Sequence, residues 1–242
     1  MGIAIAILEW TGIVLGSLIL AVAVGFAVVP PLTRGFTDRW GAADSEVAET
    51  LPGDDLVKDA QQSATRAITI DAPADVVMKL VRQQGHKRAG WHGWDWFYDA
   101  TGSGDFVDGH HSTRIVPELQ DIELGDRIFI NAMVSYSVEQ DTAPTATQPG
   151  VFMLYSGGAD GVELRASDAD KAKDASTSWL WLAKPLEDGG TRLILRIRGD
   201  MRGQGAFVAW LFDNPLDFGS ALFANKTLRG IKRTAEALAA TE

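Results

Sequence analysis

The sequence lacks cysteine altogether. This absence excludes disulfide bonds, thiol catalysis and zinc sites built from cysteine. Basic residues are also scarce, because 22 lysines and arginines stand against 32 aspartates and glutamates and give a net charge of -10. Nucleic acid selects basic surfaces, so it is excluded as an expected partner. No internal repeat of useful period is present, and the length that follows the first 30 residues suits one domain with a sizeable core.

The first 30 residues contain a long apolar run. Thr11 to Val29 carries no charge over 19 residues, which at ~1.5 Å rise per residue approaches the thickness of a bilayer's hydrocarbon core. We predict one transmembrane helix over residues 1–30, with Trp10 at the interface and Pro30 and Pro31 ending the helix. A cleaved signal peptide fits less well, because no basic residue precedes the run and no A-x-A site follows it.

Two further features describe the surroundings of this segment. Arg34 and Arg39 follow the run and no Lys or Arg precedes it, so we expect a single-pass protein of the cell membrane with a cytoplasmic C-terminal domain. Small residues at four-residue spacing allow a second membrane helix to approach closely, although such residues are common in any membrane helix. The partner-helix surface predicted in this way consists of Gly12, Gly16, Ser17, Ala21 and Gly25.

Residues 31–63 are rich in proline, glycine and acids, and they predict an extended linker. The domain proper is predicted over residues 64–242. It begins with a strand at ATRAITID, and a helix with an apolar stripe follows from Asp71-Ala72-Pro73 to about Gln83.

Periodicity then predicts a mainly antiparallel sheet. Strand candidates are DRIFINAMVSYSVE, GVFMLYSG, TSWLWLAKPL and TRLILRIRGD, and a short glycine-containing turn joins the last two. The rest of 139–178 is polar and is expected to form long exposed loops. A terminal helix carries Leu228, Ile231, Ala235 and Leu238 on one face, so the fold class is α+β.

Five segments occur in order between about Trp40 and Leu238: WGAADSEVAETLPGDDLV, ATRAITIDAPADVVMKLV, GWHGWDWFYD, STRIVPELQDIELGD and NKTLRGIKRTAEAL. Together they resemble the membrane-anchored prokaryotic members of the START-like superfamily, also called SRPBCC or the polyketide cyclase/dehydrase and lipid transport group. The resemblance implies a helix-grip fold, in which a curved antiparallel sheet wraps around a long C-terminal helix and encloses an apolar cavity. The superfamily includes lipid carriers, hormone and antibiotic binders and cyclases, so the resemblance leaves the function open.

The segment GWHGWDWFYD concentrates aromatic side chains. They cannot all share one side of a regular helix or strand, so we expect some in the core and others at a cavity or the membrane surface. TSWLWLAKPL is apolar on both faces, which favours an enclosed apolar cavity beside it. The ligand-binding residues predicted on this basis are Trp91, Trp94, Trp96, Tyr98, Trp179 and Trp181.

All four histidines, His86, His92, His110 and His111, lie within 26 residues that are also rich in aspartate. Their spacing matches no established metal pattern, so we predict neither a metal nor another cofactor. His92 with Asp95 is a candidate acid–base pair. The alternative is a structural histidine hydrogen-bonded among the tryptophans, which we prefer because no nucleophile or oxyanion donor accompanies the pair.

Residues 191–233 carry eight basic and three acidic side chains, a local charge of +5 in an acidic chain. This excess predicts contact with anionic headgroups, beside apolar side chains that enter the bilayer interface. A solvated helix face next to a buried segment is the alternative. The predicted membrane-interface residues are Trp10, Phe207, Trp210, Phe212, Lys226 and Arg229.

We therefore expect a membrane-tethered protein that binds or transports a hydrophobic small molecule, such as a lipid, isoprenoid or polyketide-like compound. Its expected partners are the bilayer and that ligand, and the tether raises their effective concentration. A structural accessory subunit of a larger membrane complex is one alternative, and it predicts a cavity filled by the protein's own side chains. A cyclase or dehydratase is the other, and it requires His92 and Asp95 to project into an open cavity.

Overall fold

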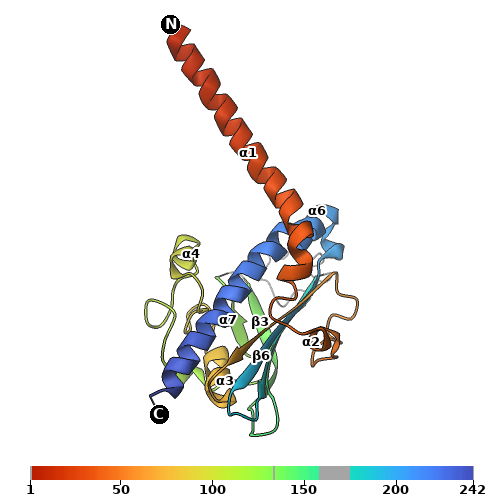
Figure 1. Cartoon of the computed structure of the whole chain (residues 1–242), viewed down its shortest axis with the longest axis vertical. Helices are drawn as coiled ribbons and strands as arrows, with labels where there is room; N and C mark the ends of the chain where they lie inside the picture. The colour runs from red at the N-terminus through yellow and green to blue at the C-terminus, as the bar shows by residue number, and fades with distance from the viewer. Residues whose placement is uncertain (1, 133, 158–174, 242) are drawn as a thin grey trace.

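A computed structural model describes residues 2–132, 134–157 and 175–241 (Figure 1). The expected loop at 158–174 lies outside the described residues. Six antiparallel strands form one sheet in the order β1-β6-β5-β4-β3-β2, and a long C-terminal helix lies against it (Figure 1). The strands are β1 (Gln62–Ile70), β2 (Arg127–Phe129), β3 (Ser135–Thr142), β4 (Gly150–Gly157), β5 (Ser176–Pro185) and β6 (Thr191–Asp200).

The helices include a very long one at each end of the chain. The predicted α+β class is confirmed, and the sheet with its long terminal helix has the helix-grip arrangement that the resemblance implied. The α-helices are α1 (Gly2–Thr37), α2 (Asp44–Ala48), α3 (Ala74–Arg82), α4 (Asp95–Ala100), α6 (Ala206–Leu211) and α7 (Asp217–Ala239). A π-helical turn, η5 (Phe212–Leu216), connects α6 to α7, and 3-10 turns occur at η1 (Pro117–Leu119) and η4 (Arg202–Gln204).

The sheet is buried on both faces, as β5 illustrates. Trp181 belongs to the large core cluster that the sheet forms with α3 and α7. Leu180 and Leu182 belong to a smaller cluster on the other face, together with Leu51. Because successive side chains of a strand point to opposite faces, both faces of β5 avoid water, as the sequence predicts.

The segment that covers the second face comes from residues 31–63, which do not form the expected extended linker. Arginines of β6 hold it against the sheet. Arg192 pairs with Glu46 at 2.7 Å, and Arg196 pairs with Asp54 at 2.7 Å. The acids that suggested a solvated tether are therefore the partners of arginines that lie about 140 residues further along the chain.

The prediction that Pro30 and Pro31 end the first helix is wrong, because α1 continues through both prolines to Thr37. Contacts with the domain hold its last turn. Arg34 pairs with Asp213 at 2.9 Å, and the carbonyl of Thr37 accepts a hydrogen bond from the Arg66 Nε at 2.8 Å. These contacts offset the backbone hydrogen bonds that the two prolines cannot donate.

The predicted membrane span is not confirmed: among the residues whose side chains the structure describes, no helix is both long and apolar enough to cross a membrane. Figure 1 shows α1 extending away from the sheet, with α6 beside its base. In the predicted partner-helix surface, Gly12, Gly16 and Gly25 have no neighbour within 4 Å of an added Cβ, and Ser17 is exposed. The side chain of Ala21 lies outside the description.

Candidate functional site: an apolar cavity beneath the terminal helix

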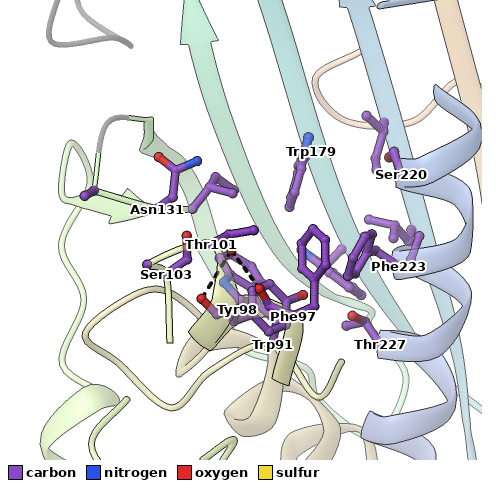
Figure 2. Close-up of a pocket in the computed structure, with 17 residues that line it drawn as sticks. Trp91, Phe97, Tyr98, Thr101, Ser103, Asn131, Trp179, Ser220, Phe223 and Thr227 are labelled. Atoms are coloured by element: carbon purple, nitrogen blue, oxygen red, sulfur yellow. Dashed lines mark hydrogen bonds between the residues drawn. The ribbon is translucent and has the colours of Figure 1, made fainter. Parts of the chain in front are cut away.

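A cavity of about 520 Å³ lies between the sheet and the N-terminal half of α7 (Figure 2). This volume falls within the range of about 300–1,000 Å³ that small-molecule sites occupy. Its walls come from β5 and β6, from α7, from α4 with the residues around it, and from the turn after β2. Six aromatic residues line it: Trp91, Phe97, Tyr98, Trp179, Trp181 and Phe223.

The cavity exists because α7 changes from small to large side chains along the face that it turns to the sheet. Ser220 and Ala224 line the cavity, whereas Leu228 and Ile231, further along the helix, are fully buried in the core. Small side chains on a packed helix leave a space that larger ones would fill. The sheet–helix interface is therefore hollow near the start of α7 and solid further along.

Aromatic contacts close one side of the cavity. The Trp91 side chain is buried and meets Trp179 edge-on, with ring centroids 6.0 Å apart. Phe97 and Tyr98 of α4 pack against Phe223 of α7, with centroid distances of 4.6 and 5.9 Å. Burial raises the pKa of the Tyr98 phenol, which therefore stays neutral.

The predicted ligand-binding residues divide into two groups. Trp94 and Trp96 do not line the cavity: Trp94 packs edge-on against Phe223, with centroids 5.1 Å apart, and Trp96 is 68% exposed. Trp94 immediately precedes α4 and Trp96 lies within it, and only part of the surface of this helix faces the cavity. The residues that do line it are Trp91, Tyr98, Trp179 and Trp181, and their contact with a ligand stays a prediction.

Sequence reasoning missed the walls that α7 and the turn after β2 supply. The apolar stripe of α7, extended from Leu228 by one turn towards the N-terminus, reaches Ala224. Helical periodicity could therefore have predicted that Ala224 faces the sheet. No local pattern marks Ile130, Asn131 and Ala132, because the fold of the sheet brings this turn to the cavity.

His92 and Asp95 do not form the candidate acid–base pair. His92 is fully buried beside α7, where its Nδ1 lies 3.5 Å from the Thr234 Oγ1. The Asp95 carboxylate instead lies 2.8 Å from the Nδ1 of His111. Neither His92 nor Asp95 lines the cavity. The geometry required by the cyclase or dehydratase hypothesis is therefore missing from the described part of the chain.

The backbone around His92 is shaped for close contact with α7. His92 has a φ of 53°, in the left-handed region. Its carbonyl oxygen would lie only 2.4 Å from a Cβ added at Gly230 of α7. The absence of a side chain at Gly230 thus lets the backbone at His92 approach α7 closely.

The buried His92 should make stability depend on pH. Burial lowers its pKa from 6.5 to about 3, so between these values the folded state binds fewer protons than the unfolded state. The contribution of the neutral His92 side chain to the free energy of unfolding is fully present above pH 6.5 and is lost as the pH falls towards 3. In His92→Asn, which tolerates the left-handed backbone, the unfolding free energy should rise relative to wild type by up to ~1.4 kcal/mol per pH unit of acidification. Urea denaturation at several pH values measures this difference, and a constant difference would contradict the assignment.

The basic excess between residues 191 and 233 is partly neutralised by acids outside this range. Besides the β6 pairs described above, Lys232 pairs with Glu236 at 2.7 Å. Arg202 pairs with Asp200, an acid that the local charge already counts. The Arg229 guanidinium lies 5.0 Å from the centre of the Trp40 ring. The local charge of +5 is therefore a poor measure of the charge available to lipid headgroups.

The other predicted membrane-interface residues differ in exposure. Phe207 and Trp210 on α6 are 70% and 42% exposed, and their rings stack 6.4 Å apart. Trp10 on α1 is exposed as well. Phe212 is half-buried, because its ring lies close to Gly199 of β6, and Lys226 is half-buried on α7.

Within the described ranges, no three histidine, aspartate or glutamate side chains converge as a metal site.

The fold and the site together define a helix-grip domain that encloses an apolar cavity beneath its C-terminal helix. No protein-family model and no curated protein matches the sequence.

Solved structures with a similar fold include a hypothetical protein from Helicobacter pylori, with 11% identity over 80% of this chain and 99% of that chain and a TM-score of 0.41. Ara h 8.0201 is similar with 11% identity over 75% of this chain and 99% of that chain, at a TM-score of 0.35. Human STARD10 is similar with 14% identity over 74% of this chain and 66% of that chain, at a TM-score of 0.34. The strand order and the position of α7 establish the architecture independently of these similarities.

Proposed function

We propose that this protein binds a hydrophobic small molecule in the cavity beneath α7. The observation that supports the proposal is a cavity of about 520 Å³ whose lining is largely apolar and includes six aromatic side chains. Transfer of apolar ligand surface from water into such a site contributes roughly 25 cal/mol per Å². Because the cavity is already formed, little of this free energy is spent on ordering its walls.

The cavity also distinguishes between the candidate functions. In the part of the chain that the structure describes, the residues that line it include no histidine or carboxylate for acid–base chemistry, which favours binding over catalysis. A purely structural accessory subunit was expected to fill this space with its own side chains, and the open cavity does not favour that alternative.

The binding proposal predicts a ligand complex of defined stoichiometry. Full-length protein purified in a nonionic detergent should carry one hydrophobic molecule per chain in native mass spectrometry, since the cavity is a single continuous volume. After that molecule is removed, added methyl retinoate should restore a one-to-one complex. The absence of both a co-purified molecule and a methyl retinoate adduct would contradict the proposal.

Association of α1 with a lipid bilayer forms the second part of the proposal. The run from Thr11 to Val29 carries no charge, and exposed apolar side chains such as Leu15 and Leu18 surround this helix. Phe207 and Trp210 expose apolar surface on α6, which lies beside the base of α1 (Figure 1). A bilayer that contacts α1 and α6 would lie on the side of the domain where α7 begins and where its cavity-lining residues are found.

Charges on α1 should release the protein from lipid. Leu15→Arg combined with Leu18→Arg places two cations among exposed apolar side chains, and each costs ~2.5–3.5 kcal/mol at the centre of a membrane helix. In flotation with phosphatidylcholine and phosphatidylglycerol vesicles, wild type should float and the double variant should largely stay at the bottom. The matched control is Val107→Arg with Leu124→Arg, two exposed apolar positions in the domain. Equal flotation of all three proteins would remove α1 as the lipid-binding element.

A further inference from the structure

We infer that the cavity selects a ligand whose enclosed part is uncharged and carries a neutral oxygen group, an inference that rests on the proposed binding function. Among the described residues, those that line the cavity include no Asp, Glu, Lys, Arg or His. Tyr98 has the most acidic side chain among them, and burial keeps its phenol neutral. An ionised group inside the cavity would therefore meet no opposite charge.

Four ionisable side chains between residues 95 and 114 form two pairs, and none of the four lines the cavity. Asp95 contacts His111, as described above, and Asp108 pairs with Arg114 at 2.8 Å. Moving an ionised carboxylate or phosphate from water into an apolar enclosure without a partner is strongly unfavourable. An anionic headgroup must stay outside the cavity or bind in its protonated form.

The polar groups that do line the cavity are neutral. Asn131 and Ser103 lie on one side, and Ser220 and Thr227 of α7 lie on the other (Figure 2). Hydroxyl and amide groups donate and accept hydrogen bonds without a charge, which suits a hydroxyl, carbonyl or ester oxygen. The expected class is thus an apolar molecule, bulky enough to contact the aromatic walls, with an alcohol, ketone or ester group.

A competition between two nearly isosteric probes tests this selectivity. Methyl retinoate and retinoic acid differ by one methyl group and, near pH 8, by one negative charge. Full-length protein in nonionic detergent is mixed with both at equal concentration, and the two adducts are counted by native mass spectrometry. For each probe, the cavity signal is the adduct intensity of wild type minus that of Ala224→Phe, a variant whose added phenyl ring fills the cavity. We expect at least about a tenfold preference for the ester near pH 8, because burial of an unpaired carboxylate costs more than 1.4 kcal/mol, the equivalent of a factor of ten.

Acidification provides a second measurement on the same pair. Near pH 5 more of the acid is protonated, so its share of the cavity signal should increase towards that of the ester. Equal binding of acid and ester near pH 8, or preference for the acid, would overturn the inference while leaving the binding function intact. No adduct of either probe above the Ala224→Phe background would instead overturn the proposed function itself.

A variant with a cation at the cavity should reverse the preference. Ser220→Lys places an ammonium group on the half-buried part of α7 that lines the cavity, and it should raise the acid-to-ester ratio at least about tenfold through a charge-assisted pair. Leu222→Lys on the same helix is the matched control, because Leu222 is 45% exposed and does not line the cavity. An unchanged ratio in Ser220→Lys would overturn the electrostatic basis of the inference.

Discussion

Ala224→Phe should weaken ligand binding strongly and leave the fold intact. Ala224 is buried on α7 and lines the cavity, so a phenyl ring at this position occupies the space that the ligand needs. A larger side chain in a solid core costs about 1–3 kcal/mol, but here the added ring enters an existing space. In the complex, the ligand and the added ring would compete for the same space, so the overpacking cost of about 1–3 kcal/mol falls on the free energy of binding. We therefore expect the affinity for methyl retinoate to fall by about ten- to a hundredfold. Native mass spectrometry measures the binding, and thermal denaturation checks the fold.

Leu222→Phe provides the matched control for this prediction. It introduces the same side chain two residues earlier on α7, at an exposed position that does not line the cavity, and it should bind as wild type does. If Ala224→Phe loses stability, Ser220→Phe fills the cavity from a half-buried position and serves the same purpose. Wild-type affinity in a folded variant with a filled cavity would contradict the location of the site.

Arg66→Met should destabilise the protein by about 3–5 kcal/mol near neutral pH, the usual cost of removing one partner from a buried ion pair. Arg66 lies in β1 and is fully buried. Its guanidinium lies 3.5 Å from Asp38, which follows α1, and 3.9 Å from Asp217, the first residue of α7. Methionine preserves much of the apolar length, but it removes the buried cation that the two carboxylates share and leaves Arg34, 3.9 Å from Asp38, as the remaining partner. Chemical denaturation of the full-length protein measures the loss.

The cost of this substitution should depend on pH in a defined direction. Burial raises the pKa of Asp38 and raises that of Asp217 from 3.8 to about 7, so the folded state holds protons that the unfolded state releases. The contribution of Asp217 to stability is complete below pH 3.8 and is lost as the pH rises to about 7. Without Arg66 the ionised carboxylates are less well tolerated, so Arg66→Met should cost more near pH 8 than near pH 5.

A second substitution tests whether the carboxylates cause this loss. Arg66→Met with Asp217→Asn removes one of the two acids that Arg66 contacts and should recover part of the stability near pH 8. Equal destabilisation of the single variant at both pH values, or no recovery in the double variant, would contradict the ion-pair explanation. Because the cluster joins the end of α1 to β1 and the start of α7, its loss should also loosen the attachment of α1 to the helix that covers the cavity.

Much of the architecture could be predicted because its signals are local. Alternation in TSWLWLAKPL predicted a strand buried on both faces, and Trp181 and Leu180 confirm it on opposite sides of the sheet. The stripe through Leu228 and Ile231 predicted the packing face of the terminal helix, and both residues are fully buried. Each pattern depends on the period of one element, which the chain carries within a few residues.

The errors arose where a residue's partner lies far away in the chain. The arginines of β6 alternate with apolar residues, as on a solvent-exposed face, but Arg196 is 4% exposed and binds Asp54. Similarly, Asp95 lies three residues from His92 but contacts His111, while the His92 side chain is fully buried. Sequence spacing gives no information on such contacts, since they depend on how the loops fold over the sheet.

By itself, the sequence determined the α+β class, the approximate positions of β1, β4, β5 and β6, the aromatic character of the cavity wall and the uncharged run in the first helix. Only the tertiary structure decided that the predicted strand from Asp126 to Glu139 divides into β2 and β3, and that the segment between α1 and β1 covers the second face of the sheet. It also decided that the cavity lies near the start of α7 and which tryptophans line it. The physical reason is that periodicity is a property of one segment, whereas a cavity and a buried ion pair arise from the fit between segments that are distant in the chain.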